Sequence, residues 1–395
     1  MTGSLMLDIL LGLVLLGYLV YGFRSGMLRS LGAMIGIVVG AIAAIFLIPL
    51  LGTWIPDPNW RIGASIAVAI ALLIGGQSVG AGIGAALRRR VKLSGLRAID
   101  RLFGAAVGVV VSALVISTVS VSIAAMGVPF LTPAISSSNV LRTIDGWTPT
   151  SAKSFLAELR STVTEESLPQ IVEALGGPTL APALPQATAP TPELMEAAQS
   201  VVRITGNAYA CGQSQSGSGF VVAADRVVTN AHVIAGVSEP VVEVPGGGAQ
   251  PATVVYFDPV DDLAVLAVAN LTAAPLDLTS TLPVGSAAVA AGYPFGGPFV
   301  SLPAEVLAVS TATINDIYGQ NPAPRSIYTL AADVQQGDSG GPLLSSSGEV
   351  AGVIFAKAQD TANLGYAVTM DELSPVADSA SALTAIVSSG ECVTG

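Results

Sequence analysis

His232 is the only histidine among the 395 residues, and it ends the segment Thr-Asn-Ala-His at 229–232. Farther along, the run Gly-Asp-Ser-Gly-Gly-Pro at 337–342 presents Ser339 on a glycine-rich turn. A serine hydroxyl is a weak nucleophile, and it needs a nearby base that titrates near neutral pH, as an imidazole does. Together the two segments predict nucleophilic hydrolysis, in which the serine attacks and the histidine removes its proton.

An acidic residue that can orient the imidazole stands between these two segments. Asp262 opens the run Asp-Leu-Ala-Val-Leu at 262–266, and a carboxylate at this point would fix the tautomer of His232. Asp261 is the alternative for the same role, but the apolar alternation begins at Leu263 and favours Asp262 at the edge of a strand. The order His, Asp, Ser also differs from the order Ser, Asp, His of the α/β-hydrolases.

Glycines around the nucleophile indicate how a developing negative charge would be held. Gly337 permits a backbone conformation that aims successive N–H groups at one point. The N–H groups of Gly337 and Ser339 are therefore the predicted oxyanion hole. One donor of this kind typically lowers a reaction barrier by roughly 3–4 kcal/mol.

The two cysteines, Cys211 and Cys392, stand near the two ends of the part of the chain that holds these motifs. Neither lies in a metal-ligand spacing, and His232 is the only imidazole, so we expect no metal and no cofactor. We predict a disulfide between them, which requires an oxidising compartment. Two buried free thiols are the alternative.

From about residue 200 the chain consists of short β-rich runs separated by turn residues, which is typical of an all-β barrel or sandwich. A break near 270–284 predicts two small barrels, with His232 and Asp262 on the first, Ser339 on the second, and the site in a cleft between them. A terminal helix is expected at 371–388. The predicted strands are 218–223, 226–229, 241–244, 253–257, 263–268, 287–291, 304–311, 326–331, 341–345, 349–356 and 364–369.

The N-terminal part has a different character. Hydrophobic residues make up 51% of the chain and charged residues only 11%, and four apolar stretches each have the length that spans about 30 Å of hydrocarbon. A secretory signal is the alternative for the first stretch, but no basic residue precedes it and three further stretches follow. We therefore predict an α-helical transmembrane bundle of four spans, at 5–22, 30–51, 62–87 and 102–127.

Loop charges predict how this bundle is oriented. Arg24 and Arg29 lie between the first two stretches, and six basic residues lie at 88–101 between the last two. The positive-inside rule puts both loops in the cytoplasm, and everything after residue 128 then lies outside. Residues 1–139 have 9 Lys and Arg against 3 Asp and Glu, whereas residues 140–395 have 7 against 24. No basic stripe lies outside the apolar part, so we expect a lipid bilayer and no nucleic acid as partner.

Glycines recur at helical spacing inside the apolar stretches. Small residues in such rows let helices approach closely in lipid, so we predict that they are packing faces. They are Gly32, Gly36 and Gly40, then Gly76, Gly80 and Gly84, then Gly104 and Gly108.

Three parts are expected along the chain. Residues 1–128 form the transmembrane domain, and residues 196–395 form the β-rich domain. Between them, residues 129–195 form an extracytoplasmic linker, with short amphipathic helices at 151–175 and a Pro-rich spacer at 176–192 that cannot build a core.

Residues 196–395 resemble the chymotrypsin-like serine proteases. The motifs behind this resemblance are Thr-Asn-Ala-His, Asp-Pro-Val-Asp-Asp-Leu-Ala-Val-Leu and Gly-Asp-Ser-Gly-Gly-Pro, and they look closest to bacterial envelope proteases of the HtrA type. The resemblance implies a double-barrel fold, a triad of His232, Asp262 and Ser339, and endopeptidase activity on proteins or peptides.

Two aspartates near the nucleophile take their expected roles from this resemblance. Asp333, six residues before Ser339, falls where an acid at the base of the S1 pocket selects Arg or Lys at P1. Lys357 on a facing strand would neutralise it, and a surface or turn-capping role is the alternative. Asp338 stands where trypsin has the aspartate that pairs with a new N-terminus, so it needs another partner, either an arginine or a terminus created by cleavage.

Residues 1–128 resemble the colicin V production family in their number of spans, their Gly-rich helices and their basic third loop. The combination looks like the actinobacterial membrane-anchored serine proteases of acid and oxidative-stress resistance. It implies a multi-pass protein of the cell membrane whose protease domain cuts envelope proteins on the periplasmic side. The alternative is a membrane scaffold or channel whose outer domain binds peptides without cutting them.

An endopeptidase tethered to an extended spacer is also expected to cut that spacer. Tethering raises the effective concentration of the spacer at the site to about the millimolar range. Basic residues are scarce there, since only Lys153, Arg160 and, at the edge, Arg203 lie in or next to residues 150–200.

Overall fold

The computed structural model divides the chain into two units, Met1–Val119 and Ser120–Gly395, and each is described by itself. About half of the predicted linker, and Cys211, lie outside the described residues. The described residues are 2–54, 58–90, 97–125, 134–135, 137–149, 151–154, 158, 170–171, 181–186, 191–208, 213–246, 248–359 and 361–393.

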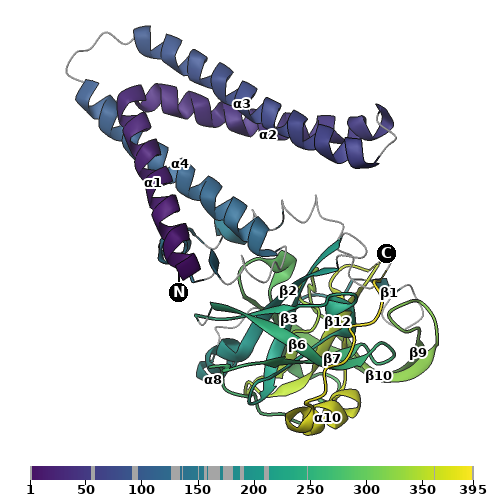
Figure 1. Ribbon diagram of the computed structural model, residues 1–395. Coiled ribbons are helices and arrows are strands. Elements are labelled where there is room, and N and C mark those ends of the chain that lie inside the picture. The colour runs from purple at the N-terminus through teal and green to yellow at the C-terminus, as the bar shows by residue number, and fades with distance from the viewer. Residues whose placement is uncertain are drawn as a thin grey trace. The chain divides into compact units, whose positions relative to one another are not determined.

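Long apolar helices make up the described part of the first unit. Each overlaps one of the predicted apolar stretches. In Figure 1 they run from purple to blue along the chain. The helices are α1 (Thr2–Ser25), α2 (Met27–Trp54), α3 (Pro58–Arg90) and α4 (Arg97–Ala125), the last of which reaches into the second unit.

Glycines bring these helices into backbone contact, which confirms the predicted packing faces. A Cβ at Gly36 would lie 2.0 Å from the carbonyl oxygen of Gly76, and one at Gly80 would lie 2.0 Å from that of Gly32. A side chain at these positions would therefore force α2 and α3 apart. Figure 1 shows α2 and α3 side by side along their length. Gly104 makes the same kind of contact between α4 and α1, against Gly22.

Two of the described helical stretches are long and apolar enough to cross a membrane by length and composition, namely Ser4–Ser25 and Ile99–Ser117. Shorter apolar stretches, Met27–Ile37 and Ala71–Leu87, lie in α2 and α3. Leucines of α1 such as Leu10 and Leu13 are more than half exposed, which suits a lipid environment better than water. The count of four spans stays a prediction.

The second unit contains a closed barrel in the strand order β2-β3-β4-β7-β6-β5. Its interior is aliphatic, with Ile204, Val227, Ile234 and Leu266 each at most 1% exposed. The strands are β2 (Val201–Ala208), β3 (Gln213–Ala223), β4 (Arg226–Thr229), β5 (Val241–Val244), β6 (Gly248–Asp258) and β7 (Leu263–Val268). The short helix α9 (Ala231–Ile234) follows β4 directly.

The remaining strands form a second sheet in the order β1-β12-β11-β8-β9-β10-β13, and β12 also pairs with β13. All are antiparallel except β1, which lies parallel to the end of β12. They are β1 (Gln170–Ile171), β8 (Ala287–Gly292), β9 (Val300–Ile314), β10 (Ala323–Ala331), β11 (Pro342–Ser345), β12 (Val350–Ala358) and β13 (Leu364–Val368). Figure 1 shows the later strands β9, β10 and β12 in green to yellow beside the teal strands β2 and β3 of the barrel.

Short helices complete the second unit. They are α6 (Asn139–Trp147), α8 (Pro192–Ala197) with η2 (Ala198–Ser200), η3 (Pro294–Gly296), and α10 (Met370–Ser379) with η4 (Ala380–Ala382). The tail beyond η4 returns to the closed barrel, where the Val387 N–H donates to the Val254 carbonyl. The guanidinium of Arg226 also holds the carbonyl of Leu383 at 2.7 Å.

The predicted strands agree with the observed ones to within a few residues at most ends, and 226–229, 241–244 and 263–268 coincide. The predicted terminal helix at 371–388 was too long, because the helical backbone stops at Ala382 and the tail then binds the barrel through its backbone. Residues 170–171 were expected in a helix but form β1, since the edge of β12 offers them hydrogen-bond partners.

Candidate active site

The Thr-Asn-Ala-His segment is held by its own polar side chains. The hydroxyl of Thr229 donates to the carbonyl of Ser218 at 2.7 Å, and the side-chain amide of Asn230 donates to the backbone carbonyl of Asp262 at 2.7 Å. Both residues are fully buried. They place the start of α9, and with it His232, beside the turn that carries Asp262. Sequence analysis quoted these residues in the motif but gave them no role.

Asp262 uses both of its carboxylate oxygens on His232. One accepts the backbone N–H of His232 at 2.9 Å, and the other contacts the imidazole Nδ1 at 2.7 Å. The Asp262 backbone is left-handed, with φ of 57°, a conformation that aspartate tolerates better than most residues. The contact orients Nδ1 as the donor and leaves Nε2 free to accept a proton. The structure thus brings Asp262 to the imidazole, as predicted.

Asp261, the alternative, has a different environment. No described contact joins it to His232, and its backbone N–H instead donates to the carboxylate of Asp258 at 3.1 Å. Burial, and next the charge of Asp258, raise the pKa of its carboxyl. Asp261 and Asp262 are adjacent in the chain, so their positions in the sequence do not show which of them contacts His232. The geometry of the turn shows that Asp262 does.

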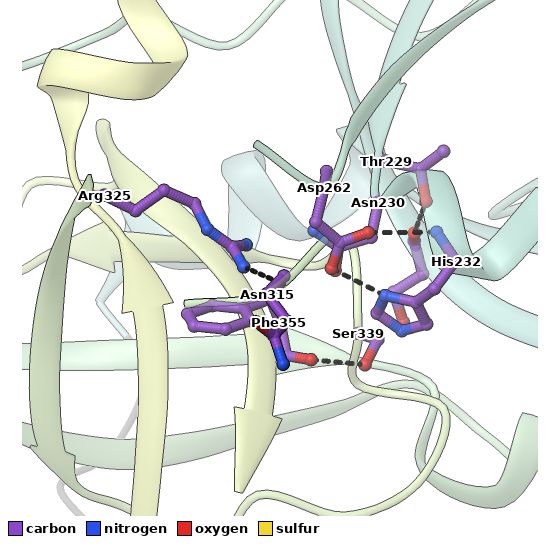
Figure 2. A network of polar contacts seen from close by, with 9 residues as sticks. Thr229, Asn230, His232, Asp262, Asn315, Arg325, Ser339 and Phe355 are labelled. Carbon is purple, nitrogen blue, oxygen red and sulfur yellow. Dashed lines mark hydrogen bonds and ion pairs between the residues drawn. The ribbon is translucent and has the colours of Figure 1, made fainter. Parts of the chain in front are cut away.

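Ser339 lies in a turn that backbone hydrogen bonds hold on both sides. Its carbonyl accepts the N–H of Ser218 at 2.8 Å, and the next N–H, of Gly340, donates to the carbonyl of Ile354 at 2.8 Å. The hydroxyl of Ser339 donates to the carbonyl of Phe355 at 3.4 Å, as Figure 2 shows. Among the described contacts no hydrogen bond joins this hydroxyl to His232, a common state of a site without substrate.

The peptide between Gln336 and Gly337 is oriented by a neighbouring loop. The N–H of Phe295 donates to the Gln336 carbonyl at 2.5 Å, and the opposite sides of a trans peptide carry C=O and N–H. The Gly337 N–H therefore points away from that loop. Within the described structure, neither this N–H nor that of Ser339 has a protein acceptor. N–H groups without protein acceptors at these two positions are a condition for the predicted oxyanion hole.

Ser218 is a residue that sequence analysis missed. Its hydroxyl donates to the Gly337 carbonyl at 2.7 Å and accepts the Tyr293 N–H at 2.9 Å, so it joins the nucleophile turn to the loop that holds Gln336. It is fully buried. Its position in the run Ser-Gly-Ser-Gly at 216–219 was the available signal, because such a run lets other backbone approach closely.

Asp338 has no arginine as a hydrogen-bond partner within the described structure, and pairing with a terminus created by cleavage stays a prediction. Within the described residues, the only hydrogen bond to its side chain comes from the N–H of Gln335 at 2.8 Å, and its other carboxyl oxygen is buried without a partner. Burial raises the pKa of Asp338 to about 7, and the N–H of Gln335 opposes that rise.

Asp338→Asn is therefore expected to change how stability depends on pH. The folded-state pKa is raised to about 7 from the ordinary 3.8, so between these values the folded domain keeps a proton that the unfolded chain has lost. The free energy of unfolding then falls as pH rises through this window. Asp338→Asn should not show this part of the decrease in the free energy of unfolding. Urea unfolding at about pH 5 and about pH 8 measures the difference. Identical differences in both proteins would contradict the assignment.

Asp333 and Lys357 line one pocket of about 420 Å³ beside the nucleophile turn. The pocket is formed by residues 332–335, 357–359 and 361–364. The Asp333 side chain is exposed and accepts the side-chain amide of Gln335 at 2.5 Å. No ion pair joins Asp333 to Lys357 among the described contacts. The structure therefore brings both predicted pocket residues together next to the nucleophile turn.

The described residues contain no group of three or more His, Cys, Asp and Glu side chains that could hold a metal ion. Cys392, the described cysteine, lies beside α9, since its Sγ is 2.8 Å from the position that a Cβ on Gly236 would take.

Comparisons with known proteins agree with this geometry. Residues 217–353 match the trypsin-like peptidase domain, and residues 7–149 match the colicin V production protein. The serine protease Rv3671c of Mycobacterium tuberculosis is 34% identical over 94% of this chain and 95% of its own length. The serine protease Do-like HtrA of Lactococcus lactis is 34% identical over 37% of this chain and 39% of its own.

A solved structure supports the same relation. The crystal structure of the Rv3671c protease from M. tuberculosis in its active form is 38% identical in sequence to this chain, with a TM-score of 0.50. The match covers 56% of this chain and 99% of the crystallised chain. This chain is thus a serine endopeptidase, and it belongs to the family of serine proteases that join a colicin V production domain to a trypsin-like peptidase domain.

Proposed function

We propose that this endopeptidase works through a triad of Ser339, His232 and Asp262, in a double-barrel domain outside the cytoplasmic membrane. The observation that carries the proposal is the pair of contacts from His232 to the Asp262 carboxylate, at 2.9 and 2.7 Å. These contacts leave Nε2 of His232 available to accept a proton from a hydroxyl group. Ser339 is the nucleophile that the glycine turn provides.

The reaction follows from these positions. As the Ser339 oxygen attacks the substrate carbonyl, Nε2 of His232 takes the hydroxyl proton, and the oxyanion accepts the N–H groups of Gly337 and Ser339. The imidazolium then gives its proton to the leaving amine, and an ester to Ser339 remains. Water, deprotonated by the same imidazole, hydrolyses that ester and restores the serine.

A fluorophosphonate probe tests this proposal, because it reacts only with an activated serine. The wild-type protein should be labelled on Ser339, whereas Ser339→Ala should not be labelled and His232→Ala only weakly. Ser310→Ala, at an exposed position on β9, serves as the control. Labelling that persists in Ser339→Ala would remove Ser339 from the mechanism.

For the membrane part we propose four spans, with the loops around Arg24–Arg29 and 88–101 in the cytoplasm and the protease domain outside. Two observations support this proposal. Two described helical stretches are long and apolar enough to cross a membrane, and apolar side chains of α1 are exposed, as they would be against lipid. Alkaline phosphatase fused after residue 128 should be active, and a fusion within 91–96 inactive. The reverse pattern would place the protease domain in the cytoplasm.

We also propose a role in envelope or acid stress, which rests on the family resemblance. A bacterium that lacks the protein should survive acid less well, and wild type, but not Ser339→Ala, should restore survival. Restoration by both would separate the role from proteolysis.

A disulfide between Cys211 and Cys392 completes the proposal. No cysteine among the described residues is a free thiol, and the tail next to Cys392 is joined to the loop after α9 by a bond from the Gly236 N–H to the Ser389 carbonyl. Closing a loop of this length stabilises by roughly 5 kcal/mol in the chain-entropy model. Alkylation of both thiols in the native, non-reduced protein would refute it.

Asp333→Asn is expected to reduce cleavage after Arg and Lys. Because Asp333 lines the pocket next to Ser339, its charge favours a basic P1 side chain, and its loss should lower kcat/KM for basic P1 by about tenfold to a hundredfold relative to apolar P1. Lys357→Ala should act in the opposite direction, since it removes a competing cation. A P1-varied peptide library measures both, and no preference for basic P1 in the wild type would remove the idea.

Wild-type protein is expected to cut its own linker. In support, two described segments of the linker, 170–171 and 181–186, contact residues that line the pocket: Gln170 pairs with Lys357, and the side-chain amide of Asn363 donates to the Pro182 carbonyl at 3.2 Å. Full-length wild type should yield a fragment smaller than 39.6 kDa, and Ser339→Ala should stay intact. If both stay intact there is no self-cleavage, and if both are cut alike another protease cuts them.

A further inference from the structure

The side chains of Glu243, Arg203 and Ser218 form a row on one face of the closed barrel. Arg203 on β2 lies directly opposite Glu243 on β5 and, on its other side, directly opposite Ser218 on β3. Residues directly opposite each other in antiparallel strands put their side chains on the same face of the sheet. The Ser218 hydroxyl accepts the N–H of Tyr293, which begins the loop at 293–297. The row therefore lies against this loop.

Arg203 holds the far end of the loop through its guanidinium. Its Nη1 donates to the Gly296 carbonyl at 2.8 Å, and its Nη2 forms an ion pair with the carboxylate of Glu243. The Arg203 side chain is 14% exposed and that of Glu243 is 31% exposed, so water screens this pair less than it screens a surface pair. The planar guanidinium thus has one nitrogen on the loop and another on a carboxylate that fixes its orientation.

The backbone of the loop at 293–297 needs such support. Phe295 has φ of 55° and ψ of 24°, and Gly296 has φ of 62°. A residue with a bulky side chain rarely adopts this left-handed conformation, which persists only where the surroundings hold it. The carbonyl that Arg203 binds belongs to the residue directly after Phe295. Without this donor, Phe295 can relax to a negative φ.

Relaxation of Phe295 would reach the nucleophile turn through one hydrogen bond. The N–H of Phe295 donates to the Gln336 carbonyl at 2.5 Å, and this bond turns the Gly337 N–H to the opposite side of the same peptide. If φ of Phe295 changes, its N–H leaves the Gln336 carbonyl, and nothing then fixes the plane of that peptide. Hydrogen bonds and backbone therefore connect Arg203 continuously to the Gly337 N–H.

We propose that Arg203 is a positioning residue for the reaction. Oriented by Glu243, it holds the loop at 293–297 in the shape that keeps the Gly337 N–H aimed into the oxyanion hole. This inference rests on the proposed oxyanion hole, and Arg203 acts through the loop. Because the oxyanion forms only on the way through the transition state, loss of Arg203 should act on kcat much more than on KM.

Arg203→Met tests this role, because methionine fills similar space without a donor. It should lower kcat by about tenfold to a hundredfold, the usual effect of displacing a catalytic group by about 1 Å, and leave KM nearly unchanged. A peptide aldehyde, whose hemiacetal with Ser339 puts an oxygen in the oxyanion hole, should bind more weakly by the same factor. Arg203→Lys should recover part of the loss, because one ammonium nitrogen replaces the two that hold Gly296 and Glu243.

Two further variants separate positioning from packing. Glu243→Ala leaves Arg203 in place but frees its guanidinium, so kcat should fall in the same direction. Combined with Arg203→Met it should add no further loss of kcat, because Glu243 acts only through Arg203. Arg226→Met is the control, since Arg226 donates to the carbonyls of Ala380 and Leu383 in the tail. It should lower the melting temperature and leave kcat and aldehyde binding unchanged.

Each outcome supports or overturns the role of Arg203. If Arg203→Met lowers only the melting temperature, or if Arg226→Met loses as much kcat, Arg203 serves packing and the inference is wrong. If Arg203→Met does not fold, Arg203→Lys and Glu243→Ala decide, and wild-type kcat in both would overturn the inference. Failure of the oxyanion hole itself is distinguishable, because Gly337→Ala would then keep wild-type kcat.

Discussion

Ser339→Ala is expected to lower kcat by about four to six orders of magnitude while the melting temperature changes little. The reason is that nucleophile, base and orienting acid act as a unit, so losing the nucleophile costs nearly as much as losing all three. The residual rate comes from binding and from the N–H groups of Gly337 and Ser339. Single-turnover kinetics on a peptide ester, together with calorimetric unfolding, make the measurement.

His232→Ala should fall to a similar level, and Asp262→Asn by about ten-thousandfold, because asparagine would favour the wrong imidazole tautomer. Ser310→Ala, an exposed serine on β9, controls for the substitution itself. Near-wild-type turnover in His232→Ala would exclude the triad, since the sequence has no other histidine.

Gly337→Ala is expected to lower kcat by about a hundredfold to a thousandfold, the usual cost of one lost oxyanion donor. Its φ is 93°, and a Cβ there would lie 2.4 Å from the Tyr293 carbonyl oxygen and 2.8 Å from the Phe295 nitrogen. The contact would break the bond from Phe295 to Gln336 and turn the Gly337 N–H. KM should change much less than kcat, because the N–H acts on charge that develops in the transition state.

Gly285→Ala is the matched control for this prediction. Its φ of 84° strains an alanine in the same way, but no atom lies within 4 Å of the new Cβ. The control should therefore lose stability and keep kcat. Equal losses of kcat in both variants would show that backbone strain, and not the orientation of the Gly337 N–H, causes the effect.

Local sequence determined most of the strands. In the β4 and β7 segments, runs of mostly apolar residues lie between turn residues. The ends of these runs coincide with the ends of the observed strands. β2 (Val201–Ala208) was missed, because it is buried on both faces and shows no alternation. The polar start of β3 is a strand only because it pairs with β2, from Ala208 opposite Gln213.

Unique residues and motifs by themselves indicated the chemistry that we propose: one histidine, one serine on a glycine turn and an aspartate between them in order. Their types restrict the reaction, since few side chains can act as base or nucleophile near neutral pH. Only the tertiary structure decided between Asp261 and Asp262, because the left-handed backbone at Asp262 turns one carboxylate to the imidazole.

Tertiary structure alone also decided the residues that support the site. Ser218 and Phe295 are far in sequence from the nucleophile turn, and each contacts that turn only because of how two segments meet in the fold. The raised pKa of Asp338, about 7, also depends on the tertiary structure. It results from burial in the folded domain and not from any local sequence pattern. The sequence shows which side chains can react. Their burial, and their contacts with segments that are distant in the sequence, determine their orientation and charge.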